Sequence, residues 1–278
     1  MSVSCATCAV EYDEPTPEVC PICADERQWV PAEGQRWTDL ATLRAAGQRL
    51  RWSDPEPGRA AISTEPSVGI GQTAQLVTTP TGSLLWDPPG YLDDETVARV
   101  RARGPVLGVA ASHPHMFGAQ LSWGEALDAP VLVCQADEQW LGRRSERIEL
   151  FGDSRTVAPG LSIHRIGGHF AGSAIAHWRD GAGGRGVVLS GDTVFPNPDR
   201  TSVGFMRSYP NKIPLSAAVV RRIADRLAEL EFDRIVGNFA NTIETGARDA
   251  VARSAQRHIA WVRGDHDDQT GTATAAPR

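Results

Sequence analysis

Four of the five cysteines of the chain form two closely spaced pairs near the N-terminus. Two residues separate the members of each pair and eleven residues separate the pairs, which are made by Cys5, Cys8, Cys20 and Cys23. Four thiolates on two tight turns are typical of a tetrahedral metal site, and zinc suits such a site because it has no redox chemistry. A segment this short cannot bury a core of its own, so the metal would supply its folding energy. We therefore expect a zinc knuckle.

Iron is the alternative ion for these four thiolates. In rubredoxin-like iron sites a glycine usually follows each cysteine pair, whereas Ala9 and Ala24 stand at those positions here. Zinc is therefore the favoured ion. The fifth cysteine, Cys134, lies in an apolar run and is expected to be buried as a small hydrophobic side chain.

A second group of residues with metal-binding chemistry follows three predicted strands. The residues and the strands before them are His113 and His115 after 106–111, His169 after 161–166, and Asp192 after 186–190. Imidazoles and a carboxylate are ligands that zinc prefers, and three histidines can leave one coordination position open for water. One such histidine alone would more often be a structural hydrogen-bonding group. Four residues of this kind, all at strand ends and flanked by glycines, indicate a metal site.

The order of these motifs resembles that of the metallo-β-lactamase superfamily. The similarity extends over about residues 75–262, and its motifs are a hairpin that ends at Asp87, His-x-His at 113–115, Gly-Gly-His-x-x-Gly-Ser at 167–173 and Ser-Gly-Asp-Thr at 190–193. The resemblance implies an α/β fold in the form of a four-layer αββα sandwich, with the metals at one edge between the two sheets. It also implies that His113, His115 and His169 bind a first metal, and that Asp192 is the carboxylate that bridges two metals.

The sequence departs from the family pattern at the second metal. The first motif of the family usually runs His-x-His-x-Asp-His, but Phe117 and Gly118 occupy its last two positions here. A later histidine of the family, which follows a glycine after a strand, is replaced by Asn238. All the ligands particular to the second metal are therefore missing, and we expect one metal in this site.

The chain is long enough for one large domain with a small appendage. We expect the knuckle and a short helical linker in residues 1–53, a metallo-β-lactamase-like domain in 72–263 and a disordered tail in 264–278. Residues 54–71 are polar and contain proline and glycine, which predicts a linker before the large domain. Further expected elements of that domain are a hairpin at 75–87, helices at 93–104, 120–127, 138–143, 215–230 and 246–262, and strands at 130–134, 173–178 and 232–236.

Composition excludes several classes of partner. The net charge of −6 argues against nucleic acid, because phosphate binding requires a surplus of positive charge. The N-terminus has no charged segment followed by an apolar run, and no apolar stretch is long enough to span a bilayer. We therefore expect a cytoplasmic protein with a small-molecule substrate and with neither a nucleic-acid nor a membrane partner. A reducing compartment also favours metal binding over disulfide formation by the paired cysteines.

These observations predict a metal-dependent hydrolase that uses metal-activated water on a small ester, thioester, amide or lactone. Asp192 is the candidate catalytic residue, either as a metal ligand or as the group that orients the attacking water. One alternative is a non-catalytic metal- or ligand-binding protein on a degenerate hydrolase fold. The other is a redox protein with iron in the knuckle. The segment 207–212, with two cations and a tyrosine, is a candidate pocket loop, and an ordinary connection explains it equally well.

Overall fold

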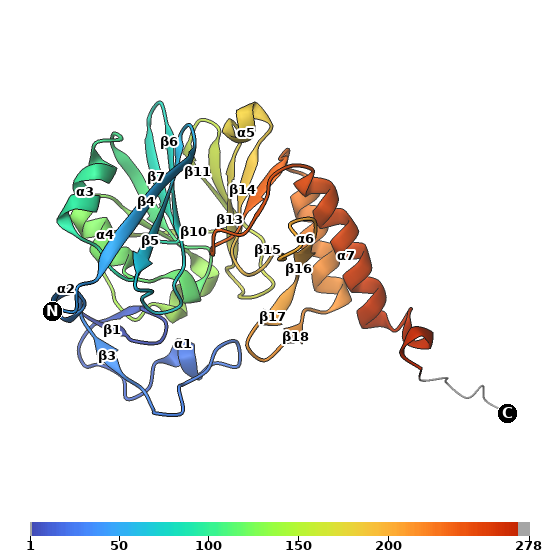
Figure 1. Ribbon diagram of the computed structural model, residues 1–278, viewed down its shortest axis with the longest axis horizontal. Helices are drawn as coiled ribbons and strands as arrows, with labels where there is room; N and C mark the ends of the chain where they lie inside the picture. Colours follow the sequence, from blue (N-terminus) through green and yellow to red (C-terminus); the bar gives the residue numbers. More distant parts are fainter. Residues whose placement is uncertain (1, 272–278) are drawn as a thin grey trace.

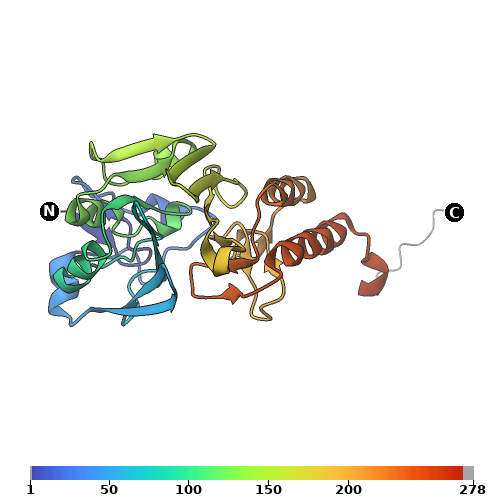
Figure 2. The same ribbon diagram turned by 90° about the horizontal axis from the view of Figure 1, so that it is seen from above.

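Two β-sheets face each other in the computed structural model, which describes residues 2–271 (Figure 1). Helices cover the outer face of each sheet, so the large domain has four layers in the order helix, sheet, sheet, helix (Figure 2). Three clusters of buried apolar side chains fill the spaces between these layers. Successive residues of one strand contribute to different clusters, since Leu85 packs toward the helices and Leu84 packs between the sheets. The predicted αββα sandwich is confirmed.

The first sheet has seven strands in the order β10-β9-β8-β7-β6-β5-β4. Strands β4 to β7 are paired antiparallel and β7 to β10 are paired parallel. Asp93 begins the covering helix α3 by accepting a 2.7 Å hydrogen bond from the backbone N–H of Thr96. The elements of this half are β4 Arg49–Glu56, β5 Arg59–Glu65, β6 Ala74–Thr79, β7 Gly82–Trp86, α3 Asp94–Arg101, β8 Val106–Ala110, α4 Gln120–Leu127, β9 Val131–Cys134 and β10 Ile148–Phe151.

The second sheet has six strands in the order β11-β12-β13-β14-β19-β20. Helix α6 lies on its outer face together with α7, and it buries Val220, Ile223 and Leu227, which are spaced as one helical face. The elements of this half are β11 Ser154–Ala158, β12 Leu161–Arg165, β13 Ala174–Trp178, α5 Gly181–Gly184, β14 Val187–Leu189, α6 Ala217–Ala228, β19 Arg234–Val236, β20 Thr242–Ile243 and α7 Ala247–Arg263.

Short elements surround one edge of the two sheets. Strands β12 and β14 are both antiparallel to β13, which lies between them, so their C-terminal ends meet at the same edge. Residues that follow these two strands are therefore brought together there. The short elements are the 3₁₀ helices Pro114–Met116 and Gln135–Trp140, and the strands β15 Phe195–Pro196, β16 Val203–Gly204, β17 Met206–Ser208 and β18 Ile213–Pro214.

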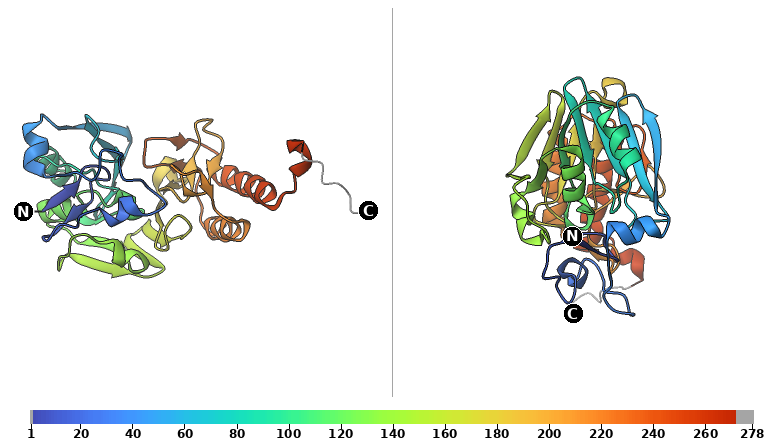
Figure 3. Two further views of the ribbon diagram at one scale, coloured as in Figure 1. Left: turned by 90° about the horizontal axis from the view of Figure 1, so that it is seen from below. Right: turned by 90° about the vertical axis from the view of Figure 1, so that its left-hand side faces the viewer.

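The N-terminal cysteine segment packs beneath this edge (Figures 1 and 3). Its elements are β1 Val3–Cys5, β2 Glu11–Tyr12, α1 Pro21–Ala24, β3 Trp37–Thr38 and α2 Leu40–Ala45. Val10, Tyr12 and Ile22 belong to the same buried apolar cluster as α3, α4 and the first sheet. The buried carboxylate of Glu11 accepts hydrogen bonds from the backbone N–H groups of Leu121 and Ser122 at the start of α4, at 3.0 and 3.2 Å. The knuckle is therefore fixed to the large domain by apolar and polar contacts.

Residues 54–71 do not form the linker that we predicted. They contribute to β4 and β5, which form the edge of the first sheet. In the first half of β4, Leu50 and Trp52 alternate with polar residues, but the second half is polar and contains Pro55, which predicted a linker. Strand β5 buries Ala60 and Ile62. Strands β10 and β11 were not predicted either, and the helix expected at 138–143 is the 3₁₀ helix Gln135–Trp140. Because β4 begins at Arg49, the first sheet begins within the segment 1–53 assigned to the knuckle and its linker.

The end of the chain is described only in part. Asp267–Thr270 form a 3₁₀ helix after α7, within the predicted tail at 264–278. Residues 272–278 of that tail lie outside the described residues. None of the helices within residues 2–271 combines the length and the apolar character that crossing a membrane requires.

Candidate metal centre and the adjoining cavity

The three predicted histidines and Asp192 converge at the edge where β8, β12 and β14 end. His113 Nε2 and His169 Nε2 lie 3.6 and 3.7 Å from Asp192 Oδ2, and His169 Nε2 lies 3.2 Å from His115 Nδ1. One potential ligand atom from each of the four residues lies within 4.8 Å of all the others, and all four residues are buried. Ligands 2.0–2.1 Å from a tetrahedral zinc ion lie about 3.3 Å apart, so the arrangement fits one such ion.

Hydrogen bonds behind the histidines turn their free nitrogens toward this centre. His169 Nδ1 donates to the backbone carbonyl of Met206 at 3.1 Å, which leaves the lone pair on Nε2. His113 Nδ1 lies 2.9 Å from the Ser112 hydroxyl, which in turn donates to the buried carboxyl of Asp87. His113 Nε2 is buried and has no hydrogen-bond partner among the described residues. A buried nitrogen without a hydrogen-bond partner lowers the stability of the folded protein, and a metal ion bound to this atom would remove that cost.

The protonation states at this centre also suit a metal. Burial, followed by repulsion from His113, lowers the pKa of His115 well below its usual value and that of His169 to about 4. Burial alone would raise the pKa of Asp192, but the attraction of the surrounding histidines outweighs it and holds this pKa below its usual value. His115 and His169 are therefore neutral and Asp192 is ionised, which are the forms that bind zinc.

The positions of the missing second-metal ligands are filled by packing and by a hydrogen bond. Phe117 is buried in the apolar cluster shared with the knuckle. Gly118 has φ +50°, and a Cβ there would lie 2.5 Å from the backbone oxygen of Pro88. Asn238 donates from its amide to Asp192 Oδ1 at 3.0 Å and lies 3.2 Å from the sulfur of Met116. These three positions therefore supply no histidine or carboxylate ligand for a second ion.

The four cysteines of the knuckle form a second, separate cluster. Their sulfur atoms all lie within 4.8 Å of one another, and those of Cys5 and Cys23, like those of Cys8 and Cys20, are 3.7 Å apart. Sulfur ligands 2.3 Å from a tetrahedral zinc ion lie about 3.8 Å apart, which fits this spacing. Hydrogen bonds among the thiols lower the pKa of Cys5 and Cys20 and raise that of Cys8 and Cys23, so the sulfurs share protons as one group.

Arg27 links the knuckle to the histidine centre. Its guanidinium donates to the backbone carbonyl of His169 at 3.2 Å and lies 3.6 Å above the ring of Phe170. Asp25 holds the same guanidinium through two hydrogen bonds. The Phe170 ring packs against the rings of all three histidines of the centre, with centroids 4.8–5.7 Å away. The sequence analysis missed Arg27, because no local motif marks a contact between residues so far apart in the chain.

A cavity of about 280 Å³ opens onto His115 and Asp192. One wall comes from the knuckle, and the opposite wall includes Tyr209 and Pro210 between β17 and β18. The Tyr209 hydroxyl donates to the backbone carbonyl of Asp192 at 3.0 Å. The candidate loop at 207–212 therefore contributes its aromatic residue to this cavity.

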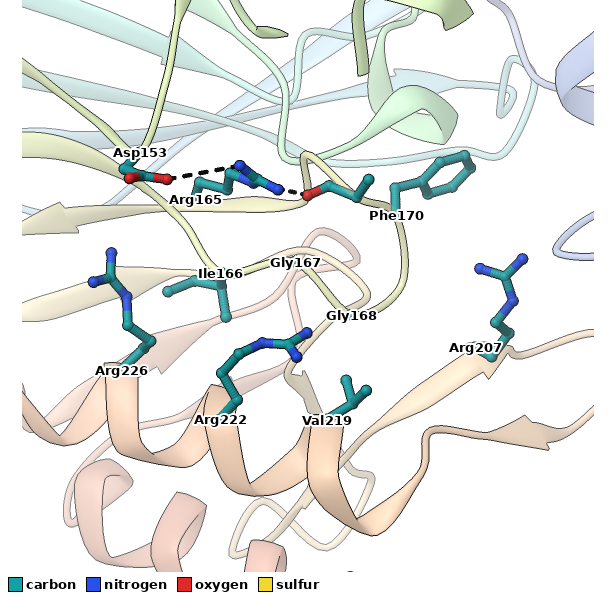
Figure 4. Close-up of a pocket in the computed structure, with 11 residues that line it drawn as sticks. Asp153, Arg165, Ile166, Gly167, Gly168, Phe170, Arg207, Val219, Arg222 and Arg226 are labelled. Carbon is teal, nitrogen blue, oxygen red and sulfur yellow. Dashed lines mark hydrogen bonds and ion pairs between the residues drawn. The ribbon is translucent and has the colours of Figure 1, made fainter. Parts of the chain in front are cut away.

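A larger cavity of about 650 Å³ is lined by Gly167, Gly168 and Phe170 of the loop that follows β12 (Figure 4). Its cations are Arg165, Arg207, Arg222 and Arg226, and Asp153 is the acidic residue among those that line it. None of the four residues of the histidine centre lines it. The cavity that reaches the centre is thus the smaller one beside the knuckle.

Solved structures with the same fold are metallo-β-lactamases. The chain superposes on VMB-1 with a TM-score of 0.57 and 12% identity over 77% of this chain and 98% of that chain. DIM-1 metallo-β-lactamase gives 0.56 and 12% over 78% and 98%, and the mono-zinc form of FIM-1 from Pseudomonas aeruginosa gives 0.53 and 16% over 76% and 96%. The chain is therefore a protein of the metallo-β-lactamase fold, with a four-cysteine cluster at its N-terminus.

One relative defines the family more narrowly. The chain is 39% identical to the uncharacterized protein YmaE of Bacillus subtilis (strain 168). The alignment spans 259 residues and covers 92% of this chain and 94% of YmaE. The chain belongs to the same family as YmaE. No family model matches the sequence.

Proposed function

We propose that the protein is a hydrolase with one catalytic metal, bound by His113, His115 and His169 with Asp192 beside the open position, and that it acts on a small ester, thioester, amide or lactone. The observation that carries the proposal is the convergence of three imidazoles and one carboxylate beside a cavity. The metallo-β-lactamase fold supports it, because such a centre lies at the same edge of the sandwich. Zinc is the proposed ion here and in the cysteine knuckle, with iron as the alternative.

Zinc bound by three neutral histidines would act as a Lewis acid and lower the pKa of water from 15.7 to about 7. Asp192 is ionised, and Asn238 holds its Oδ1, which leaves Oδ2 facing the histidines. We assign to Oδ2 the role of orienting the attacking water and accepting its proton. Phosphoester hydrolysis by two metals is disfavoured, because Phe117, Gly118 and Asn238 supply no second set of ligands.

Turnover on a panel of uncharged esters, thioesters and lactones tests the proposal. His115→Ala should abolish activity, because two histidines cannot hold zinc tightly at neutral pH. Asp192→Asn should retain much of the metal and lose roughly 10²–10⁴-fold in rate if the carboxylate is the general base. His164→Ala is the matched control, since its ring contacts Ser162 in β12 and lies outside the centre. Activity that survives His115→Ala would exclude the metal mechanism.

The same experiment separates two other functions. A protein that binds metal but turns over no substrate of the panel would be a binding protein on a degenerate hydrolase fold. Visible absorbance of the purified protein would indicate iron in the knuckle and a redox role, because zinc sites are colourless. A cytoplasmic location and a small-molecule substrate complete the proposal.

A further inference from the structure

The cavity beside the histidine centre has one wall that the metallo-β-lactamase-like domain does not supply. Thr7, Arg27, Gln28 and Trp29 of the knuckle line it, opposite Phe195, Tyr209 and Phe239. The cavity also reaches His115 and Asp192. A molecule that reacts at the centre and extends into this space would therefore contact both modules.

Two large apolar side chains at this cavity are exposed to solvent. The side chains of Trp29 and Phe239 are 53% and 38% exposed, although aromatic side chains of this size are usually buried. They lie on opposite modules and line the same cavity, which also contains Phe195. Exposed apolar surface that lines a concave site marks a place where an apolar ligand would be buried.

The polar groups of the cavity limit what it accepts. Gln28 is 7% exposed, and its Oε1 is buried without a hydrogen-bond partner among the described residues. The guanidinium of Arg27 is already held by Asp25 and by the carbonyl of His169, so it is not free to pair with an anionic ligand. An uncharged ligand with one hydrogen-bonding group suits this set.

We propose that the cysteine knuckle forms part of the substrate site. Trp29 packs against an apolar group of an uncharged ester, thioester or lactone, and the side-chain amide of Gln28 binds a polar group of the same substrate. The proposal rests on the hydrolase function proposed above, and it adds the class of substrate and the residues that select it. At about 280 Å³ the cavity suits a group of the size of a phenyl ring rather than a long chain.

Binding of two hydroxamates to the zinc-loaded full-length protein tests the proposal without turnover. Hydroxamates chelate zinc, so acetohydroxamate probes the centre alone, and phenylacetohydroxamate adds a phenyl ring for the cavity. Burial of the ring should make phenylacetohydroxamate bind roughly 10- to 100-fold more tightly. Trp29→Ala should remove most of this advantage and leave the affinity for acetohydroxamate unchanged, as measured by calorimetry. Trp261→Ala, which removes a tryptophan of similar exposure from α7, should change neither affinity.

A third ligand tests the amide of Gln28. Phenylacetylglycine hydroxamate adds one peptide group between the ring and the chelating group. Gln28→Ala should weaken its binding by roughly 5- to 10-fold, the effect of one lost hydrogen bond, and leave that of acetohydroxamate unchanged. Gln256→Ala on α7 is the matched control.

The outcomes distinguish this inference from the function on which it rests. Equal binding of acetohydroxamate and phenylacetohydroxamate by the wild-type protein would overturn the inference and leave the metal centre intact. A phenyl advantage that persists in Trp29→Ala would also overturn it. Binding of neither hydroxamate would overturn the proposed hydrolase centre together with the inference.

Discussion

The side-chain amide of Asn238 donates a 3.0 Å hydrogen bond to Oδ1 of Asp192, the oxygen that faces away from the histidines. In the family pattern a histidine ligand of the second metal stands at the place of Asn238. An amide N–H thus forms a hydrogen bond with the carboxylate oxygen that would otherwise bind a second ion. This replacement keeps Asp192 oriented toward the histidines, whose attraction holds its pKa below the usual value.

Asn238→Ala should lower the activity of the histidine centre and leave much of its metal in place. Loss of the amide leaves Asp192 Oδ1 buried without a donor, so the carboxylate is less well oriented to act on the attacking water. Removal of such a supporting hydrogen bond typically costs roughly 10- to 100-fold in activity. Turnover measures the rate, and elemental analysis measures the metal content. Asn197→Ala, which removes an amide that contacts Ser202, should leave both unchanged.

Gly118→Ala should destabilise the fold more than an ordinary glycine replacement. The backbone has φ +50°, and a Cβ would lie 2.5 Å from the carbonyl oxygen of Pro88. Gly246→Ala is the matched control, because Gly246 has φ +67° with no atom within 4 Å of its Cβ position. The control should cost about 1–2 kcal/mol from the backbone conformation alone. Urea unfolding should give a larger loss of unfolding free energy for Gly118→Ala than for Gly246→Ala. Equal losses would show that the backbone at Pro88 moves to make room for the methyl group.

Glu11 should make the stability of the protein depend on pH. Burial raises the pKa of this carboxyl above its usual 4.5, despite hydrogen bonds from Ser122 and attraction by Arg143. Between the unfolded and the folded pKa the folded state holds more protons, so the free energy of unfolding falls as pH rises through this window. Glu11→Gln removes the titration. Unfolding in urea between pH 4.5 and 8 should therefore show a smaller fall in the variant, and identical pH profiles would refute the assignment.

Arg27→Met should loosen the contact between the knuckle and the histidine centre. The variant loses the hydrogen bond to the His169 carbonyl and leaves Asp25 without its partner, which should cost about 2 kcal/mol of unfolding free energy. Arg27→Lys should not restore it, because an ammonium cannot bind Asp25 through two nitrogens or lie flat over Phe170. Arg51→Met breaks an exposed ion pair with Glu65 and should cost much less, because water screens the pair. Comparable losses for Arg27→Met and Arg51→Met would contradict the account.

Both clusters of potential metal ligands could be predicted from the sequence, because their residues lie in short motifs. The cysteines stand in two local turns, and His113, His115 and Asp192 directly follow apolar strands whose ends must meet at a sheet edge. The alternation of apolar runs and amphipathic helices predicted most strands and helices, and the resemblance to the metallo-β-lactamase superfamily supplied the αββα sandwich. These signals involve residues close together in the sequence, so they can be recognised without knowledge of the tertiary contacts.

What could not be predicted depends on contacts between distant segments. Strand β4 is at the edge of the first sheet and exposes most of its residues, and its apolar alternation is limited to Leu50 and Trp52 before a polar stretch with Pro55. The contact of Arg27 with His169 joins residues 142 positions apart, and no spacing rule predicts it. The wall that Trp29 contributes to the cavity depends on how the knuckle packs against the large domain. The hydrogen bond from the backbone of Leu121, at the start of α4, to Glu11 is one of the contacts that fix this packing.

Cys20→Ser combined with Cys23→Ser should release one metal and unfold the knuckle, because the thiolates take the place of a core there. The histidine centre should keep its ion, since none of its ligands comes from the knuckle. Cys134→Ser is the control, because Cys134 lies in β9 away from both clusters. Simultaneous loss of both metals would show that the two centres do not form independently.

The metal content of the purified full-length protein tests the central claim most directly. Elemental analysis should find two metal ions per chain, one for the four cysteines and one for His113, His115, His169 and Asp192. His115→Ala should retain only the ion of the knuckle. Three or more tightly bound ions in the wild type, or two ions in His115→Ala, would contradict a histidine centre that holds a single metal.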